Sequence, residues 1–324
     1  MFLYLIATFI ISFAISLFSL PILIKKLKAA NILGIDVHKP NKPQIPEMGG
    51  FSIIFSVIGS LIFAIALNTF FGFEFNLIQI LTFMLTFSII AIIGIFDDLF
   101  DLRQSLKAFL PMVAALPLVA INFSSSTVMF IPFLGHIDFG IFYTIFLIPL
   151  GITVASNLTN MLAGFNGLEV GLGIIIFSTL SIISFSVGSI EASLISVSML
   201  GALLVFFYFN KYPSKVFPGD IGTLSIGCAV ACASIFGNFE SFGALLLSLH
   251  IVDFFIKLLN GFPKSFGELK EDGKLYPPEN KIKSLVHLIM KVFNGIKELD
   301  LVLILYLAQF LVAIFCLLLF FRVF

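Results

Sequence analysis

The chain has 324 residues, of which 60% are hydrophobic and only 11% are charged. Soluble globular domains carry roughly 25% charged residues, so this composition excludes an ordinary soluble domain and indicates an integral membrane protein. Lysine plus arginine and aspartate plus glutamate both total 18. That balance alone excludes neither anionic ligands nor nucleic acid, so the distribution of the charges has to decide between partners.

Ten apolar segments are candidates for membrane helices, because crossing the hydrocarbon core takes about 20 apolar residues. The first has no basic n-region and no small-residue cleavage site, so we expect it to be retained rather than removed as a signal peptide. The sequence predicts an all-α polytopic membrane protein with about ten transmembrane helices. The segments lie at 2–24, 50–69, 77–96, 107–122, 139–156, 168–187, 190–209, 222–237, 241–259 and 300–322.

The basic residues fall on one side of this arrangement. The odd-numbered loops and the segment ends beside them hold every lysine and arginine except Arg322, whereas loops two, four, six and eight hold none. Cytoplasmic loops of membrane proteins carry an excess of lysine and arginine. We therefore expect the odd-numbered loops to be cytoplasmic and both termini to lie outside.

The ninth loop, 261–299, is long enough to form structure of its own. Asp272-Gly273 lies between two short strand-like runs, which predicts a hairpin. Apolar residues then recur at helical spacing while the lysines lie largely off that stripe, which is typical of a basic amphipathic helix on the inner membrane surface. The stripe consists of Ile282, Leu285, Val286, Ile289, Phe293 and Ile296.

The third segment ends in a cluster of carboxylates, which are Asp97, Asp98 and Asp101 of the stretch IIAIIGIFDDLFDLRQSLKAF. On a continued helix these side chains are neighbours, and they repel each other unless a cation or a basic group offsets them. One interpretation is a solvated cap of the next helix, with Arg103 as counter-ion. The other is a site for a phosphate and its metal, since Lys107 follows at the entrance of the next apolar segment.

Two further cytoplasmic loops carry polar groups that suit a hard cation and a nucleotide. The fifth loop reads SNLTNMLAGFNGLEVG, and its amides and glycines indicate either ligand contacts or a polar turn. The seventh loop reads NKYPSKVFPGDIGTLSIG and places Asp220, just after Phe217, at the start of an apolar segment. A carboxylate there is also a common helix cap, so the convergence of three polar loops on one membrane face favours a site.

Four stretches in order carry a resemblance to a known family. They are DVHKPNKPQIPEMGG, FDDLFDLRQSLKAFLP, NLTNMLAGFNGLE and YPSKVFPGD, and the resemblance spans nearly the whole chain. The chain resembles the polyprenyl-phosphate N-acetylhexosamine-1-phosphate transferases, and within them the eukaryotic and archaeal branch. That branch transfers N-acetylglucosamine-1-phosphate from UDP-N-acetylglucosamine to dolichyl phosphate.

The resemblance implies a role for individual residues. It implies a metal held by Asp220 and Asn160, and phosphates steadied by Lys107. Asp97 and Asp98 lie where the lipid phosphate attacks. The remaining implied positions are substrate contacts at Asp36, Glu47, Asn166 and Phe217, the last two around the uridine.

The same resemblance implies the reaction, its cofactor and its setting. The reaction is Mg²⁺-dependent, with Mn²⁺ as the alternative metal, releases UMP and begins lipid-linked oligosaccharide synthesis for protein N-glycosylation. The expected partners are a UDP-sugar, a polyprenyl phosphate and the membrane, with no nucleic acid and with a homodimer left open. We expect one integral membrane transferase domain over 1–324, with 261–299 as a cytoplasmic loop subdomain. Its active site would face the cytoplasm of an archaeal plasma membrane or the endoplasmic reticulum.

Departures from the family pattern leave alternatives open. Bacterial relatives carry aspartates at the positions of Ala163 and Asn166 and a histidine-rich motif in the ninth loop, which is absent here. The eukaryotic branch has a basic sugar-binding stretch in that loop, for which this chain offers GFPKSFGELK. A same-family enzyme with another UDP-sugar is therefore one alternative. A transporter or lipid flippase is another, although such proteins place ionisable groups near the membrane midplane rather than at one face.

Overall fold

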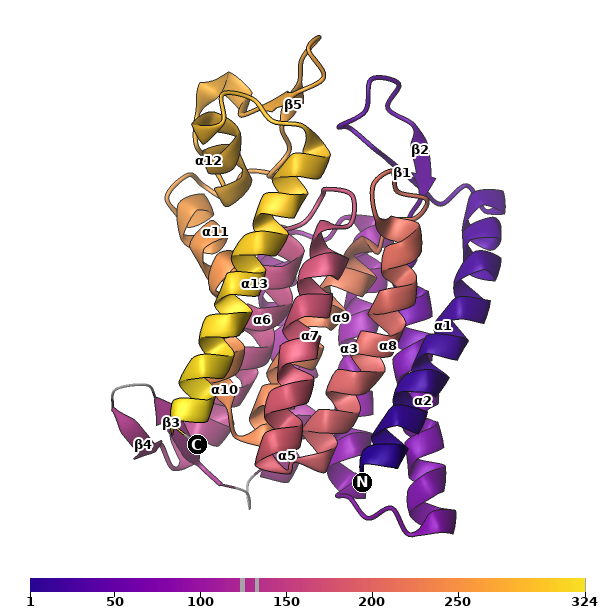
Figure 1. The fold of residues 1–324 in the computed structure, drawn as a ribbon, viewed down its shortest axis with the longest axis vertical. Helices are drawn as coiled ribbons and strands as arrows, with labels where there is room; N and C mark the ends of the chain where they lie inside the picture. The colour runs from indigo at the N-terminus through magenta and orange to yellow at the C-terminus, as the bar shows by residue number, and fades with distance from the viewer. Residues whose placement is uncertain (123–125, 132–133, 324) are drawn as a thin grey trace.

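The computed structural model describes residues 1–122, 126–131 and 134–323. Long helices run side by side between two ends that carry the loops and short hairpins (Figure 1). The eight helices from the N-terminus to the middle of the chain are α1 Phe2–Ala29, α2 Gly50–Phe71, α3 Leu77–Phe100, α4 Gln104–Ala114, α5 Leu116–Asn122, α6 Ile148–Met161, α7 Leu168–Val187 and α8 Ile190–Asn210. The others are α9 Gly219–Gly237, α10 Glu240–Leu246, α11 Ser248–Leu258, α12 Leu285–Val292 and α13 Glu298–Val323.

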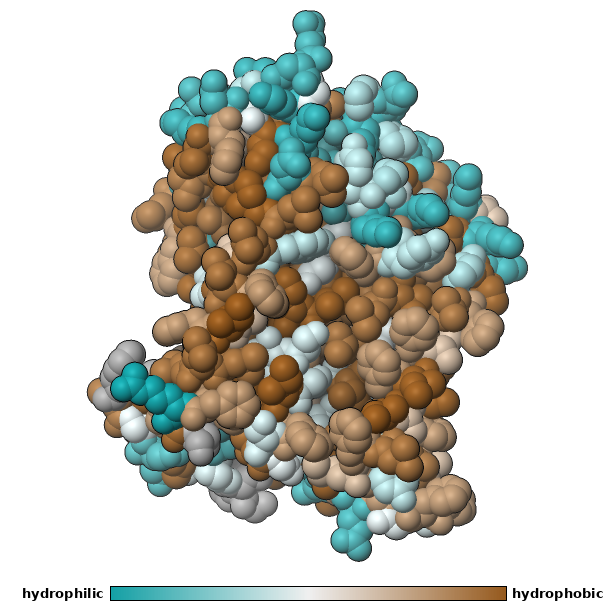
Figure 2. All heavy atoms as spheres, in the orientation of Figure 1, coloured by the Kyte–Doolittle hydropathy of each residue, from teal (hydrophilic) through white to brown (hydrophobic). Residues whose placement is uncertain are grey.

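The predicted membrane spans are confirmed. Within the described ranges, nine helical spans are long and apolar enough to cross a membrane, and there are ten if the pair α10 and α11, bent by 65°, is one span. The fourth span consists of α4 and α5, and the fifth begins with a π-helical turn, Tyr143–Leu147, that continues into α6. Figure 2 shows hydrophobic residues in a broad band across the visible face and hydrophilic residues gathered at the end that carries loops one and nine.

Helix α9 is the most enclosed of these spans, with 78% of its apolar window buried. Its small residues allow close approach of its neighbours, as is typical of helix packing in membranes. A Cβ atom at Gly227 would lie 2.1 Å from the carbonyl oxygen of Ala155 in α6, and one at Gly94 in α3 would lie 2.4 Å from the Cα atom of Ile221. Helices α3 and α6 therefore both pack closely against α9, and the ends of these helices that we predict to be cytoplasmic lie near one another.

The helix ends extend further than the apolar segments indicate. Helix α3 continues through Asp97 and Asp98 to Phe100, and α6 continues through Asn160 to Met161. The fifth loop was therefore predicted too long, because polar side chains in a last helical turn do not interrupt backbone hydrogen bonding when that turn lies at the membrane boundary.

In the part of the chain that the structure describes, three antiparallel hairpins complete the fold. Strands β5 Glu268–Leu269 and β6 Leu275–Tyr276 form the hairpin predicted in the ninth loop. Strands β1 Leu33–Ile35 and β2 Gln44–Pro46 pair in the first loop, and β3 Val128–Ile131 and β4 Gly135–Asp138 pair at the opposite end of the bundle. Neither of these two was predicted.

The amphipathic helix of the ninth loop is present but shorter than its apolar stripe. Helix α12 covers only eight residues, and Ile282 and Ile296 lie outside it. Its side chains Leu285, Val286 and Met290 are buried within the protein. The stripe therefore packs this loop onto the helical bundle.

Candidate active site

The acid cluster lies in the last turn of α3. The Asp97 side chain is 1% exposed, and its Oδ1 atom accepts a hydrogen bond from the backbone N–H of Leu102 at 3.1 Å. Asp101 ends the helix in a left-handed conformation, with φ 47°, and its side chain is fully exposed. The chain thus turns sharply after α3 while Asp97 stays inside the turn.

Lys107, in the first turn of α4, is the cation of this cluster. Its Nζ atom lies 2.6 Å from Asp97 Oδ1, 3.6 Å from Asp101 Oδ1 and 3.7 Å from Asp220 Oδ2. Its side chain is 19% exposed, so the ammonium group is largely but not wholly removed from solvent. The predicted association of this lysine with the acid cluster is present in the structure.

Asp98 faces the first turn of α9. Its Oδ1 accepts a hydrogen bond from Asp220 N–H at 2.7 Å, and its Oδ2 accepts one from Ile221 N–H at 3.1 Å. These amides are among the unpaired donors of a helix N-terminus, where a negative charge is stabilised by the helix dipole. Gly219 has φ +68°, and a Cβ atom there would lie 2.6 Å from Asp98 Oδ2, so glycine permits this close approach.

Asn160 lies in the last turn of α6, next to a contact between α6 and α9. The preceding residue, Thr159, donates a hydrogen bond from Oγ1 to the carbonyl oxygen of Thr223 at 2.8 Å, which fixes α6 against the first turns of α9. Asn160 is half-buried, and in the described part of the chain no hydrogen bond is recorded for its amide. Its carbonyl oxygen is therefore available to a ligand.

The charges of this cluster do not balance. Asp97, Asp98 and Asp220 present three carboxylates to one ammonium group, that of Lys107. Glu47 adds a fourth acid that interacts electrostatically with Asp98, and burial raises the pKa of Glu47 above its ordinary value. Carboxylate and amide oxygens are the ligands that Mg²⁺ and Mn²⁺ prefer, so the donor set fits a divalent cation that would offset the excess negative charge.

Phe217 is held against the first loop by backbone hydrogen bonds. Its N–H donates to the Pro46 carbonyl at 2.8 Å, and its carbonyl accepts from Gly49 N–H at 2.9 Å. A Cβ atom at Gly34 would lie 2.8 Å from Glu47 Oε2 and 3.2 Å from the Phe217 ring, so these two side chains flank the same glycine. Phe217 and Glu47 therefore lie together beside the acid cluster.

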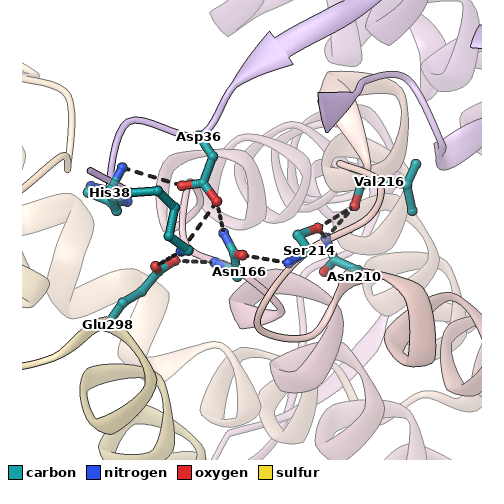
Figure 3. A network of polar contacts seen from close by, with 8 residues as sticks. Asp36, His38, Asn166, Asn210, Ser214, Val216 and Glu298 are labelled. Atoms are coloured by element: carbon teal, nitrogen blue, oxygen red, sulfur yellow. Dashed lines mark hydrogen bonds and ion pairs between the residues drawn. The ribbon is translucent and has the colours of Figure 1, made fainter. Parts of the chain in front are cut away.

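Asp36 and Asn166 belong to a second polar cluster (Figure 3). Asn166 Nδ2 donates to Asp36 Oδ2 at 3.1 Å, and Asn166 Oδ1 accepts from Ser214 N–H at 2.7 Å. Asn166 N–H donates to Glu298 Oε1 at 2.8 Å, and Lys39 forms ion pairs with both Asp36 and Glu298. Lys39, Ser214 and Glu298 were not selected from the sequence.

His38 lies at the edge of this second cluster. Its ring stacks on Phe165 with centroids 4.4 Å apart, and its Nε2 atom accepts a hydrogen bond from Gly267 N–H at 3.2 Å. Burial lowers the pKa of His38 to about 4, so the ring is neutral at pH 7. This side chain joins the first loop to the fifth and the ninth.

A cleft of about 610 Å³ opens between the first loop and the β5–β6 hairpin. Lys39, Lys42 and Lys270 line it together with Phe266 and Glu268. Two of the predicted stretches, the first loop and GFPKSFGELK, therefore face each other across one opening.

The predicted site residues thus fall into two neighbouring groups. Asp97, Asp98, Lys107 and Asp220 contact one another directly. Glu47 and Phe217 adjoin that group through the contacts given above, Asn160 follows the residue that ties α6 to α9, and Asp36 and Asn166 form the second cluster.

Comparison with known proteins identifies relatives of this chain. The sequence profile described as glycosyl transferase family 4 matches residues 80–238. A Saccharolobus solfataricus protein, provisionally named UDP-N-acetylglucosamine–dolichyl-phosphate N-acetylglucosaminephosphotransferase, is 40% identical over 300 residues, which cover 92% of this chain and 91% of that protein. The Dictyostelium discoideum protein of that name is 29% identical over 280 residues, covering 74% and 66%.

A bacterial relative has a different name. The phospho-N-acetylmuramoyl-pentapeptide-transferase of Halalkalibacterium halodurans is 31% identical over 255 residues, which cover 73% of this chain and 76% of that protein. The resemblance inferred from the four stretches is confirmed by these matches. The chain therefore belongs to glycosyl transferase family 4 and is a membrane transferase.

Proposed function

We propose that this protein transfers N-acetylglucosamine-1-phosphate from UDP-N-acetylglucosamine to a polyprenyl phosphate of the dolichyl type and releases UMP. The names of the archaeal and eukaryotic relatives support this choice of substrates. The product would be the first lipid-linked sugar of a pathway that builds oligosaccharides for protein N-glycosylation. The acid cluster would face the cytoplasm of an archaeal plasma membrane or of the endoplasmic reticulum.

The observation that carries the proposal is the meeting of Asp97, Asp98, Asp220 and Lys107 at the ends of membrane-spanning helices. A polyprenyl phosphate has its chain in the bilayer and its phosphate at the surface, so its reacting group reaches only a site at that depth. An ammonium group among carboxylates at the helix ends suits an anionic headgroup that meets a metal-bound diphosphate.

The metal of this site would be Mg²⁺, with Mn²⁺ as the alternative, held by Asp220 and Asn160. When bound, it would offset negative charge that develops on the diphosphate. Lys107, whose ammonium group lies 3.7 Å from Asp220 Oδ2, would hold a phosphate oxygen. Its salt bridge to Asp97 fixes the direction of its ammonium group before substrate arrives.

The chemical step needs no strong base. The second pKa of a phosphate monoester is near 6, so at neutral pH the lipid phosphate is largely a dianion. One of its oxygens attacks the β-phosphorus of the UDP-sugar, the bond from that phosphorus to the bridging oxygen breaks, and UMP leaves with the bond electrons. Asp97 and Asp98 would position the groups, and Asp98 already uses both oxygens to hold α9.

The nucleotide would lie between the two polar clusters. Phe217 would stack on the uracil, and Glu47 in the first loop would contact the substrate beside it. One Nδ2 hydrogen of Asn166 is not used by its bonds to Asp36 and Ser214, and it would donate a hydrogen bond to the uridine. Asp36 would act on the substrate through this amide.

A direct test is UMP release by the purified protein in detergent, with polyprenyl phosphate, Mg²⁺ and a panel of UDP-sugars. We expect UMP with UDP-N-acetylglucosamine and a lipid product that carries the sugar and one added phosphate. Preference for a UDP-N-acetylmuramoyl-pentapeptide donor would instead assign the reaction named for the bacterial relative. Absence of UMP with every donor would contradict the proposed reaction and favour a transporter.

A further inference from the structure

Lys39 is the only cation between two buried acids of the second polar cluster within the described residues. Its Nζ atom lies 3.3 Å from Asp36 Oδ2 and forms a closer ion pair with Glu298 Oε2. The side chains of Asp36 and Glu298 are 4% and 3% exposed, and that of Lys39 is 14% exposed. Two carboxylates so enclosed repel each other, and the ammonium group between them makes their burial possible.

The ammonium group of Lys39 occupies the place that a metal ion could otherwise take in this cluster. Ligand atoms of Asp36, His38 and Glu298 lie within 4.8 Å of one another, a spacing that a metal ion could use. Lys39 already contacts the two carboxylates of that set. We therefore assign the positive charge to Lys39 and no second metal to this cluster.

The two carboxylates fix the fifth loop. Glu298 Oε1 accepts the backbone N–H of Asn166, and Asp36 Oδ2 accepts its side-chain amide (Figure 3). Helix α13 holds the same loop at a second point, since Tyr306 donates its hydroxyl to the Gly167 carbonyl at 2.6 Å. With its N–H and its amide group both tied, Asn166 has one orientation.

The oriented Asn166 side chain in turn holds the seventh loop. Asn166 Oδ1 accepts from Ser214 N–H, and Ser214 Oγ donates to the Val216 carbonyl at 2.8 Å. Asn210 Nδ2 donates to the same carbonyl at 2.8 Å. A continuous set of hydrogen bonds therefore runs from the carboxylates beside Lys39 to the Val216 carbonyl, and the next residue is Phe217, whose ring is proposed to stack on the uracil.

We propose that Lys39 is a positioning residue that sets the affinity for the nucleotide. By holding the two carboxylates in place, it fixes the positions of the fifth loop and of Phe217. This inference rests on the proposed function, because it assigns the nucleotide to Phe217 and Asn166. Lys39 acts through Asp36 and Glu298, and its Nζ atom also lies 4.3 Å from the centroid of the Tyr212 ring in the seventh loop; none of these described contacts involves the acid cluster around Asp220. Removing its charge therefore affects nucleotide binding more than lipid binding.

The test uses four variants of the full-length protein. Lys39→Met keeps the length of the side chain without its charge, and Lys39→Arg keeps the charge. Glu298→Gln keeps the oxygen that accepts from Asn166 N–H, and the fourth variant combines Lys39→Met with Glu298→Gln. Lys281→Met is the matched control. Lys281 lies in the ninth loop and forms an exposed ion pair with Glu279.

We expect Lys39→Met to raise the KM for the UDP-sugar and the Kd for UDP by roughly tenfold, the loss typical of one charge-assisted hydrogen bond. The KM for the lipid phosphate should change less than twofold. The combined variant should be no worse than Lys39→Met alone, because the two residues act as one pair, and Lys39→Arg should recover most of the affinity. Lys281→Met should match the wild type.

Hydrogen–deuterium exchange separates this inference from the proposed reaction. Backbone amides in 162–168 and 210–218 should exchange faster in Lys39→Met, while Asp220 and Ile221, which donate to Asp98, keep the wild-type rate. Unchanged exchange together with strictly additive effects of the two substitutions would mean that Lys39 contacts the substrate itself, and would overturn the positioning role. If the wild type makes no UMP, the proposed reaction fails, while the exchange rates still decide whether Lys39 holds these loops.

Discussion

Asp98 caps the first turn of α9, accepting the N–H of Asp220 and of Ile221 at 2.7 and 3.1 Å. The neighbouring acid, Asp97, instead pairs with Lys107. Two adjacent aspartates thus have different tasks: one fixes the position of α9 and the other fixes the lysine. Both tasks orient groups, which favours direct attack of the lipid phosphate over a covalent aspartyl intermediate.

Replacing Asp98 with alanine removes both of these acceptors. We expect the thermal midpoint to fall by an amount that corresponds to about 1 kcal/mol, the usual cost of a lost helix cap, and activity to fall much further because Asp220 is no longer held in place. Asp98→Asn keeps one acceptor oxygen and should be closer to the wild type in stability. Detection by mass spectrometry of a sugar-phosphate adduct on Asp97 or Asp98 would contradict the positioning role.

Replacing Lys107 with alanine tests the electrostatic contribution of the cluster. We expect kcat/KM to fall by about 10²–10³, the range observed when one transition-state stabiliser is removed. Lys107→Arg should recover little, because a planar guanidinium does not replace a compact ammonium group in contact with Asp97 and Asp220. Nearly full activity of the alanine variant in the UMP assay would make this lysine an interfacial anchor only.

The sequence predicts the acid cluster well because its members stand out locally. Asp97, Asp98 and Asp220 are charges at the ends of apolar runs, and Lys107 follows within the same stretch. The second cluster has no such local signal. Lys39 and Glu298 are 259 positions apart, and each resembles an ordinary interfacial charge until the fold brings them together.

Other differences between the predicted and the observed structure lie at helix ends and in loops. Asn160 was expected in a loop, but α6 continues one residue beyond it, and Lys257 and Ser265 donate hydrogen bonds to the carbonyl of Met161, the last residue of that helix. Such capping from a distant helix is not visible in a local pattern. The same holds for the β1–β2 hairpin, whose strands are joined by a segment that contains Pro40 and Pro43.

The proposed orientation can be tested by cysteine labelling in intact cells. Cysteines introduced at Ser126 and Gly188 should react with a membrane-impermeant reagent from outside, and one at Asn41 should not. All three positions are exposed, whereas the native Cys228, Cys232 and Cys316 are buried, so the unmodified protein is a suitable blank. Labelling of Asn41 from outside would reverse the orientation and move the site away from the cytoplasm.

His38 should make stability depend on pH. Its folded pKa of about 4 lies below its ordinary value of 6.5, so between these values only the unfolded chain binds the proton. The neutral ring therefore contributes fully to the free energy of unfolding above pH 6.5. This contribution is lost as pH falls toward 4, by about 1.4 kcal/mol per pH unit for one proton. The thermal midpoint of the wild type should therefore fall more steeply than that of His38→Gln between pH 7 and 5, and parallel curves would contradict this.

Asp220→Asn tests whether this residue is a metal ligand or only part of a helix start. Asn should preserve the first turn of α9, because that turn is capped by Asp98 and not by the Asp220 side chain, so the thermal midpoint should stay near the wild-type value. Mg²⁺ is usually held by one or two protein carboxylates together with substrate phosphates, so losing one of them should be severe. We expect activity to collapse and the Mg²⁺ concentration for half-maximal UMP release to rise in any activity that remains. Titration of both proteins with Mg²⁺, and with Mn²⁺ followed by electron paramagnetic resonance, measures the two effects separately. If Asp220 were structural only, the variant would bind Mn²⁺ and respond to Mg²⁺ like the wild type, and the metal would have to be assigned to Asp97 and Asn160 instead.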